Sequence, residues 1–358
     1  MATRHAIFLL SRERLRSLVI FAALLICAVT FAPPPAASAA APSDAIVLSE
    51  FIYESAPFPA CHASTIVQTQ HGLAVAWFGG TKEGNPDVCI WVSLHRGDKW
   101  LPVVKVADGI QANGTRYACW NPVLFQPRNG PLLLFYKIGP TAARWWGMMM
   151  SSADEGVVWT SPRRLPAGIF GPIKDKPIQF ADGTILCPSS TQIGGWNVHM
   201  ERTNDLGRTW TETGSLNDAR TTPLIQPTIL DHGKGNLQIL CRSMDGLIYE
   251  SWSTNNGYNW SPIAATALPN PNSGIDAVQL KDGRSMLIYN NSPKNRYPIN
   301  IAVSPDGHSW KMALVVEATH GELSYPAIIQ TDDGLVHITY TWKRQRIRHV
   351  VLDPGKIP

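Results

Sequence analysis

Short apolar runs separated by glycine turns recur along most of the chain. Examples are FADGTIL around Gly183, LKDGRSMLIY around Gly283 and QTDDGLVHITY around Gly334. Runs of this length with a central Gly predict β-hairpins rather than helices. The turns follow one another at intervals of about 50 residues, at Gly72, Gly130, Gly183, Gly235, Gly283 and Gly334. The pattern therefore predicts six similar β units.

A second periodic signal is the phrase TNDLGRTW at 203–210. Its relatives are SADEGVVW at 152–159, STNNGYNW at 253–260, SPDGHSW at 304–310 and the degenerate SLHRGDKW at 93–100. Short polar side chains and Gly favour a tight turn, and the Trp anchors the returning strand by burying apolar surface. We expect these boxes to hold the β units together and to do no chemistry.

Six turns and five boxes predict an all-β fold, a six-bladed β-propeller in which the last unit lacks a box. Residues 41–358 are expected to form one domain, because the period runs through without a linker. Ala45 to Tyr53 should pair with the C-terminal strands LVHITYTWK and RIRHVVL. That pairing would close the ring and remove exposed strand edges.

Residues 1–40 predict a secretory signal peptide. The segment has a basic start, an apolar run at 18–31 and the sequence Ala37-Ser38-Ala39, which is typical of a cleavage site. We therefore expect a secreted or periplasmic protein without a stable membrane partner. Removing residues 1–39 takes away four Arg and one Glu, so the formal net charge falls from +4 to about +1. This balance gives no support to nucleic-acid binding.

The five cysteines after the signal have no zinc-site spacing, and no residue pattern indicates a metal or a cofactor. A disulfide between Cys61 and Cys119 is one pairing that the sequence allows, and a buried free thiol is expected at Cys89 and Cys241. The oligomeric state is not indicated.

In a propeller, the segments that enter the innermost strands meet on one face of the ring. We therefore expect the binding site where polar and aromatic residues recur at this point of each repeat. These segments are Glu54 to Ser64, Cys119 to Asn121, Ile173 to Lys176, Gln226, Asn270 to Asp276 and Glu322 to Tyr325. The candidates for contacting a ligand there are Trp120, Asn121, Lys137, Lys174, Gln226, Arg242, Arg296 and Tyr340.

The box repeats, with NRYPINIAVSPDGHSW and ELSYPAIIQTDDGLVHITYTWK, resemble the sialidase (neuraminidase) superfamily. FPACHASTIV, AWFGGTKEGNPDVCIWVS, GPIKDKP, CPSST and NPNSGIDAV resemble its bacterial and plant branch of neuraminidase-like BNR proteins. The resemblance covers the chain after residue 40. It implies a glycan substrate that carries an acidic sugar.

Sialidases hold the substrate carboxylate with three arginines, use a Tyr activated by a Glu as nucleophile and use an Asp as acid/base. Carried over by position, the resemblance implies that Arg242 and Arg296 are two of the arginines and that Tyr325 is the nucleophile. Glu83 or Asp87 lies near the place of the acid/base.

Two positions depart from the family pattern. His62, in Cys61-His62-Ala63, occupies or adjoins the place of the first arginine, and Gln226 stands where the activating Glu is expected. A free tyrosine has a pKa near 10 and Gln cannot take its proton. Another carboxylate, such as Glu250, Asp276 or Glu322, would have to replace the Glu.

Three functions remain open. The first is a retaining or inverting exo-glycosidase on an acidic sugar, with Tyr325 as nucleophile, Glu322 or Asp276 as its base and Asp87 or Glu83 as the acid. The second is a uronate lyase or related rhamnose/uronate enzyme, with His62 and Tyr325 as base and acid and Arg242 or Gln226 neutralising the carboxylate. The third is a propeller that binds glycans without catalysis.

Overall fold

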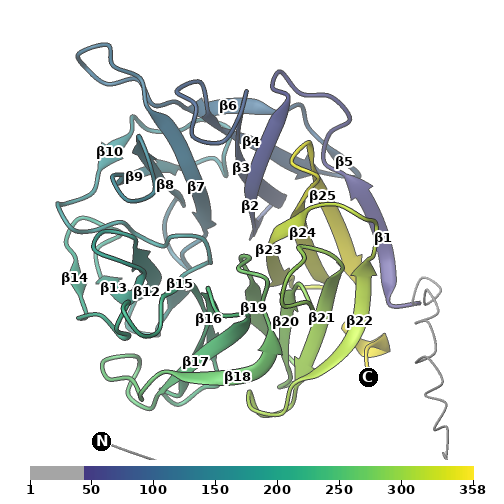
Figure 1. Cartoon of the computed structure of the whole chain (residues 1–358). Helices are drawn as coiled ribbons and strands as arrows, with labels where there is room; N and C mark the ends of the chain where they lie inside the picture. The colour runs from purple at the N-terminus through teal and green to yellow at the C-terminus, as the bar shows by residue number, and fades with distance from the viewer. Residues whose placement is uncertain (1–43) are drawn as a thin grey trace, which may run out of the picture. The chain divides into compact units, whose positions relative to one another are not determined.

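The computed structural model describes residues 44–358, so the predicted signal peptide lies outside the described residues. These residues belong to one compact unit, Ala40–Pro358. Six antiparallel sheets stand around a common centre like the blades of a propeller (Figure 1). The predicted six-bladed β-propeller is confirmed.

Each blade contains four strands that run from the centre to the rim, and the first blade has a fifth. Blade 1 comprises β2 (Ala60–Thr69), β3 (Gly72–Gly80), β4 (Cys89–Arg96), β5 (Lys99–Trp100) and β6 (Val104–Ala107). Blade 2 comprises β7 (Ala118–Phe125), β8 (Leu132–Gly139), β9 (Trp146–Ser152) and β10 (Arg163–Arg164). Blade 3 comprises β11 (Ile178–Gln179), β12 (Ile185–Thr191), β13 (Asn197–Thr203) and β14 (Thr211–Glu212).

Blade 4 comprises β15 (Leu224–Asp231), β16 (Leu237–Ser243), β17 (Leu247–Ser253) and β18 (Ala264–Pro269). Blade 5 comprises β19 (Asp276–Gln279), β20 (Ser285–Tyr289), β21 (Ile299–Ser304) and β22 (Lys311–Glu317). Blade 6 comprises β23 (Leu323–Gln330), β24 (Val336–Trp342), β25 (Arg346–Leu352) and β1 (Ile46–Phe51). The described helix is one 3₁₀ turn, Pro354–Lys356, and no helix of the described residues is long and apolar enough to cross a membrane.

The N-terminal strand β1 pairs antiparallel with β25, with Glu50 opposite His349 and Phe51 opposite Arg348. The two ends of the chain therefore share one sheet, which is visible as the purple and yellow strands in Figure 1. The predicted closure of the ring is confirmed.

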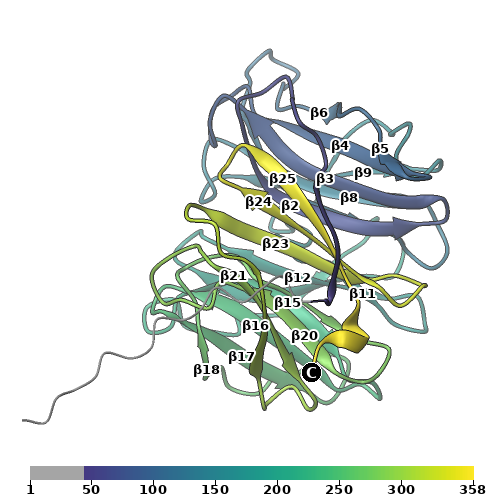
Figure 2. The same cartoon turned by 90° about the vertical axis from the view of Figure 1, so that its right-hand side faces the viewer.

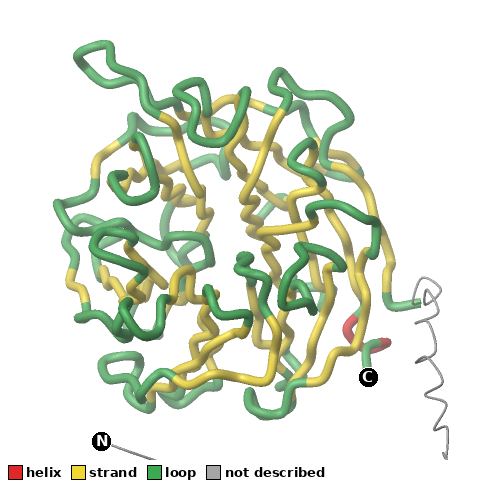
Figure 3. The backbone as a smooth tube through the Cα atoms, in the orientation of Figure 1, coloured by secondary structure: helices red, strands yellow, loops and turns green. Residues whose placement is uncertain are grey.

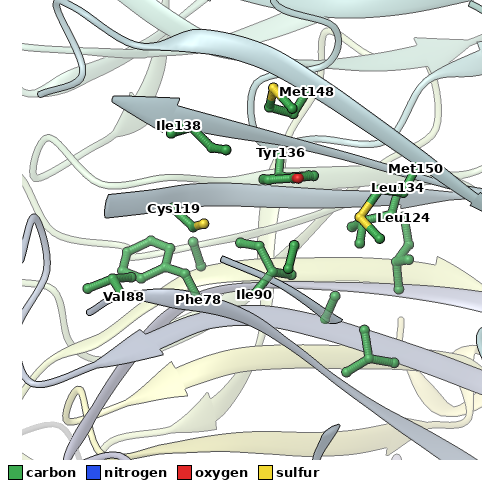
Figure 4. Packing of buried hydrophobic residues seen from close by; sticks show 14 of the residues in the cluster. Phe78, Val88, Ile90, Cys119, Leu124, Leu134, Tyr136, Ile138, Met148 and Met150 are labelled. Carbon is green, nitrogen blue, oxygen red and sulfur yellow. The ribbon is translucent and has the colours of Figure 1, made fainter. Parts of the chain in front are cut away.

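Apolar side chains fill the space between each pair of neighbouring blades. One such core, between blades 1 and 2, contains Phe78, Ile90, Leu124, Leu134 and Tyr136 (Figure 4). Five similar clusters lie between the other neighbouring blades. The hydrophobic effect thus holds blade to blade and leaves the centre of the ring to polar groups.

The predicted glycine turns connect the first and second strands of every blade, and all six glycines have a positive φ, for example 90° at Gly183. The boxes form turns after the third strand. In the box of blade 3, Thr203 donates to Asp205, the Gly207 amide donates to Thr203, and Trp210 donates to the Gly207 carbonyl at 2.8 Å. Trp210 also packs in the core against blade 2. Each box therefore ties its blade to the preceding one.

The degenerate sequence at 93–100 differs from the other boxes, because it forms the hairpin of β4 and β5. The Trp100 indole donates to Glu50 instead of its own turn, at 2.9 Å, and still packs between blades 6 and 1. All five cysteines of the described residues are free and buried, so the pairing of Cys61 with Cys119 is not formed.

Candidate active site

The site lies at the face where the innermost strands begin. In each blade the first and third strands run away from this face, so the boxes, which follow the third strand, lie at the opposite end of the ring. Figure 2 shows the ring from the side. Loops from several blades surround the ring's centre on this face (Figure 3).

Four innermost strands share one local irregularity near their start. The pairing of β2, β7, β15 and β23 with the next strand shifts register after His62, Trp120, Ile225 and Ser324. A residue with positive φ follows each shift, at Ala63, Asn121, Gln226 and Tyr325. Such bulges redirect side chains and are found beside functional sites. Asn121, Gln226 and Tyr325 thus lie within their strands, at the bulges, whereas Lys174, Asn272 and Glu322 lie just before theirs, as predicted.

Tyr325 is the centre of the cluster. Its side chain is buried, and its hydroxyl oxygen accepts a hydrogen bond from Arg242 Nη1 at 2.6 Å and one from Gln226 Nε2 at 3.3 Å. Burial by itself would raise the pKa of Tyr325. The charges of Arg242 and Arg296 and the Gln226 hydrogen bond outweigh burial, so the pKa lies below its ordinary value of 10. Gln226 therefore acts on the phenol as a donor.

Arg242 extends from the end of β16 and is itself held in place. Its Nε donates to Asn272 Oδ1 at 2.7 Å and its Nη1 to Gln226 Oε1 at 3.0 Å. The guanidinium lies over the rings of Trp196, 5.2 Å from the centroid, and Tyr325, 5.6 Å away. Burial lowers the pKa of Arg242, but arginine stays charged at neutral pH.

Two further arginines share one carboxylate. Glu322 accepts from Arg296 at 3.0 Å, from Arg344 at 2.9 Å and from the hydroxyl of Ser324 at 2.8 Å. Arg344 also binds Glu83 across the boundary between blades 6 and 1. Burial would raise the pKa of Glu322, yet these hydrogen bonds and charges bring it below the usual value. Glu322 is therefore ionised and holds Arg296 and Arg344 in place. No hydrogen bond joins Glu322 to Tyr325.

His62 lies beneath Tyr325, with the two ring centroids 4.1 Å apart. Its Nδ1 is 3.1 Å from Thr341 Oγ1, and its buried Nε2 has no hydrogen-bond partner among the described residues. Burial, followed by the charges of Arg344, Arg296, Arg242 and Lys174, lowers the pKa of His62 well below 6.5. This histidine is neutral and only 1% exposed, so it supports the ring of Tyr325 rather than facing a ligand.

Lys174 forms the floor of the site. Its ammonium is fully enclosed and donates to Asp175 at 2.7 Å, to the Ile275 carbonyl at 2.7 Å and to the Pro326 carbonyl at 2.5 Å. The last bond fixes the residue that follows Tyr325 in the bulge. Lys174 is therefore placed to position the tyrosine and not to bind a ligand directly.

Four predicted site residues lie outside the cluster around Tyr325, namely Asp276, Lys137, Tyr340 and Asp87. Asp276 accepts from Lys176, Thr228, Ala277 and Ile328, so both carboxylate oxygens are engaged in joining blades 3 to 6. Lys137 is buried and donates to the Pro172 carbonyl, and burial lowers its pKa to about 7.

Tyr340 points into the core between blades 5 and 6, where its hydroxyl donates to Glu317 and burial raises its pKa. Asp87 caps its own loop by accepting from the amide and hydroxyl of Thr81, both at 2.8 Å. The structure thus gives these residues other partners than Tyr325. Glu250, the other carboxylate considered, binds Gln238 and Trp252.

The rim of the site carries Trp120, Asn121 and Glu83. The Trp120 indole donates to the Gly139 carbonyl at 2.9 Å and its ring packs beside Trp145, while Asn121 is buried at the bulge of β7. Next to Glu83 and Arg344 is a cavity of about 290 Å³, otherwise lined mainly by apolar side chains such as Phe78 and Val88.

Sequence reasoning missed Arg344 and Thr341, and it included Asn272 only as part of the segment Asn270 to Asp276. Arg344 lies in the loop between β24 and β25 with a φ of 61°, and Asn272 precedes β19 with a φ of 55°. The available signal for Arg344 was a charged residue in a short loop on the same face of the ring as the site. The partners of Arg344, Glu322 and Glu83, lie 22 and 261 residues away in the chain, so spacing along the chain did not reveal them.

One group of side chains has the spacing of metal ligands, namely His199, Glu201 and Glu212. The Glu201 oxygens already accept from the amides of Phe170 and Gly171, from Ser189 and from His199. Because these donors satisfy the carboxylate, the group is better explained as a hydrogen-bonded core network.

The sequence matches the BNR repeat-like domain family over residues 71–338, which is more than half of the chain. The chain belongs to this family. No curated protein matches the sequence significantly.

Solved structures with the same fold include a protein of unknown function from Dyadobacter fermentans, 16% identical, with a TM-score of 0.72 over 86% of this chain and 98% of the other. The Hadza microbial sialidase Hz136 is 17% identical, with a TM-score of 0.72 over 84% of this chain and 66% of the other. A variant of the NanB sialidase from Streptococcus pneumoniae is 11% identical, with a TM-score of 0.72 over 88% and 71%. At these identities the similarity shows that this BNR protein has the sialidase-like propeller fold.

Proposed function

We propose that this BNR protein is a secreted exo-glycosidase that releases a terminal sugar bearing a carboxylate, with Tyr325 as nucleophile. The observation that carries the proposal is the 2.6 Å hydrogen bond from Arg242 to the Tyr325 hydroxyl, together with the lowered pKa of this phenol. An arginine at the hydroxyl makes the phenol easier to ionise, and so offsets part of the loss of a carboxylate at position 226. Two of the similar structures carry the name sialidase, which supports the choice of an acidic sugar.

The arginines provide the rest of the binding site. Arg242 and Arg296 both face the ring of Tyr325, at 5.6 and 5.8 Å from its centroid. A substrate carboxylate placed between these guanidinium groups would be held beside the nucleophile, because the planar fork matches a carboxylate. Arg344 continues the positive surface toward blade 1, where it forms ion pairs with Glu322 and Glu83.

In the proposed reaction, the Tyr325 oxygen bonds to the anomeric carbon while the bond from that carbon to the leaving oxygen breaks. Water then cleaves the tyrosyl intermediate and retains the anomeric configuration. Glu83 is the candidate proton donor for the leaving oxygen, because Asp87 is fixed by Thr81 and Glu322 is shared by two arginines, whereas Glu83 is paired with Arg344 alone. In this role Glu83 first leaves Arg344 and takes up a proton from water. An aryl leaving group needs no such proton.

The test compares an aryl sialoside with sialyl oligosaccharides, using the wild-type protein and the variants Tyr325→Phe and Tyr258→Phe. We expect Tyr325→Phe to lower kcat/KM by at least about a thousandfold on both substrates. Tyr258, which is 65% exposed on a box, serves as the matched control and should leave turnover unchanged. A fluorinated sialic acid analogue should add its mass to the wild-type protein and not to the Tyr325→Phe variant. Undiminished turnover by Tyr325→Phe contradicts the role of nucleophile.

One observation favours a second candidate, elimination on a uronate. The two arginines beside Tyr325 lower the pKa of its phenol. Glu322 is kept ionised by its own ion pairs. Tyr325 could then take the proton next to a uronate carboxylate while the sugar bonded at the β position leaves and a double bond forms. His62, the base that the sequence indicated, lies 4.1 Å from the ring of Tyr325 with its Nδ1 at Thr341. An unsaturated, ultraviolet-absorbing product from oligouronates would support this reaction over hydrolysis.

Binding without catalysis is the third outcome. Ligand binding by the wild-type protein, with no product from either substrate class, would make the propeller a glycan receptor and contradict both reactions.

A further inference from the structure

A strip of aromatic and basic side chains crosses blade 6 beside the site. It consists of Trp342 and Lys343 at the end of β24, Arg346 and Arg348 on β25 and Phe51 at the end of β1. Trp342 is the partner of Arg346 in the sheet, and Arg348 is the partner of Phe51. Arg346 and Arg348 are two residues apart on one strand, so their side chains lie on the same face.

The cations of the strip lie on the aromatic rings. The Arg346 guanidinium is 3.6 Å from the Phe51 centroid and 5.0 Å from that of Trp342. Arg348 is 4.4 Å from Phe51, and Lys343 Nζ is 4.5 Å from Trp342. The two rings meet edge to face at 5.3 Å. These contacts fix the positions of three cations that are otherwise at the surface.

The strip begins at the proposed active site. Arg344 follows Lys343 in the same loop and binds Glu322 and Glu83. Neighbouring strands are about 4.8 Å apart, so the path from β23 across β24 and β25 to β1 spans roughly 14 Å. A ligand longer than one sugar could therefore leave the site along blade 6.

The strip carries more positive than negative charge. The strip has three cations, Lys343, Arg346 and Arg348, and two carboxylates beside them; the neighbouring Arg344 is already paired with Glu322 and Glu83. Glu317 accepts from Trp342, and Glu54, whose side chain is 79% exposed, pairs with Arg346. Exposed ion pairs of this kind contribute little stability and exchange readily for another anion. A partner of the strip should thus bear several negative charges.

We propose that this strip binds the part of the substrate that remains after cleavage, and that this part is an oligosaccharide carrying carboxylate or sulfate groups. The inference rests on the proposed function of the site, because it assigns the strip to the leaving-group side of the same substrate. The rings of Phe51 and Trp342 are already covered by cations, which favours contact with anionic groups over stacking of bases.

The experiment measures binding and kinetics of the variant R346Q/R348Q, of R346K/R348K and of the control R208Q. Arg208 is exposed on a box at the opposite end of the ring. The probes are oligogalacturonates, chondroitin sulfate oligosaccharides and neutral oligosaccharides of equal length, each at low and high salt. Thermal unfolding of every variant checks that the edge of blade 6 is intact.

We expect R346Q/R348Q to bind the anionic probes roughly tenfold more weakly at low salt. R346K/R348K should recover most of the loss, and R208Q should not differ from the wild type. With substrates whose leaving group is such an anionic oligosaccharide, KM should rise and kcat should stay. Turnover of the aryl sialoside should not change, since its leaving group does not reach the strip.

Equal binding of anionic probes by the wild type and R346Q/R348Q overturns the inference, even if the enzyme is active. Equal binding of single-stranded DNA and of the glycans by the wild type also overturns it, because the strip would then be a general polyanion surface. If no glycoside is turned over but R346Q/R348Q still loses the anionic glycan, the proposed reaction fails and the strip stands as a binding surface.

Discussion

At the scale of single residues, the environment of one phenol decides what the site can do. Tyr325 is buried, which disfavours its ionised form, and it is flanked by two arginines, which favour that form. The arginines prevail. A Gln at position 226 is compatible with this arrangement, because its amide donates to the tyrosine and its carbonyl accepts from Arg242.

Gln226→Glu should raise the pKa of Tyr325. A carboxylate at this position would add a negative charge beside the hydroxyl and would engage Arg242, so the phenolate would lose stabilisation. The ultraviolet absorbance of the phenolate, titrated against a Tyr325→Phe blank, measures the shift. The same change at Gln279, which lies in the turn of blade 5, should not affect the titration. A pKa that stays constant or falls in Gln226→Glu contradicts our account of the site.

At the scale of elements, the boxes and the bulges have different roles. The boxes fasten one end of each blade, and the bulges direct side chains into the other. Because the two devices lie at opposite ends of the strands, changes in a box should alter stability without altering the site.

Asp205→Ala should therefore lower the free energy of unfolding by about 1–2 kcal/mol. Asp205 accepts from the amides of Arg208 and Thr209 and from the hydroxyl of Thr209. Urea unfolding measures the loss, and catalytic or ligand-binding measurements should be unchanged. Asp205→Asn is the matched control, since Asn255 makes the corresponding bond to the Asn259 amide in blade 4. An Asp205→Ala protein as stable as the wild type would show that the turn holds without this carboxylate.

The periodic and local features were predictable from the sequence, and the long-range ones were not. Gly183 and its equivalents repeat at a fixed interval and act within their own hairpins, so the blades could be counted. Arg242, Arg296, Gln226 and Tyr325 were expected together, and the structure brings them together.

Arg344 was missed because it lies in a loop and its partners are distant in the sequence, whereas Tyr340 was misplaced on its strand. Which face of a blade a side chain occupies depends on strand register, and a shift by one residue reverses it. Similarly, the burial of His62 and three of the four donors around Asp276 come from neighbouring blades. Composition alone contains no such information.

At the scale of the whole molecule, the ring depends on the joint between blades 6 and 1. A buried histidine, His349, and a partly buried one, His337, lie there, with His337 Nδ1 3.0 Å from His349 Nε2 and His349 Nδ1 3.0 Å from Glu50 Oε1. Burial lowers the pKa of His337 to about 4, with His349 adding to this and Asp333 opposing it, and burial also lowers the pKa of His349. His95 faces both rings.

The protein should lose stability as the pH falls from 6.5 toward 4. In this window an unfolded His337 takes up a proton and the folded one does not, so protonation favours unfolding. The loss from His337 across the window is about 3 kcal/mol. Urea unfolding at neutral and acidic pH measures it, and His337→Gln should flatten the dependence while the exposed His320→Gln should not. Equal pH dependence in His337→Gln and the wild type contradicts the assignment.

The pairing of β1 with β25 also sets an order of events in biosynthesis. Glu50 in β1 and His349 in β25 are 299 residues apart, so β1 is synthesised long before the strand with which it pairs. At typical elongation rates this delay is roughly 15–60 s. During that time Ile46–Phe51 is a strand without its neighbour, which is the kind of segment that other chains and chaperones bind. The nascent protein can build its blades one after another, but it becomes a ring only after β25 has been made.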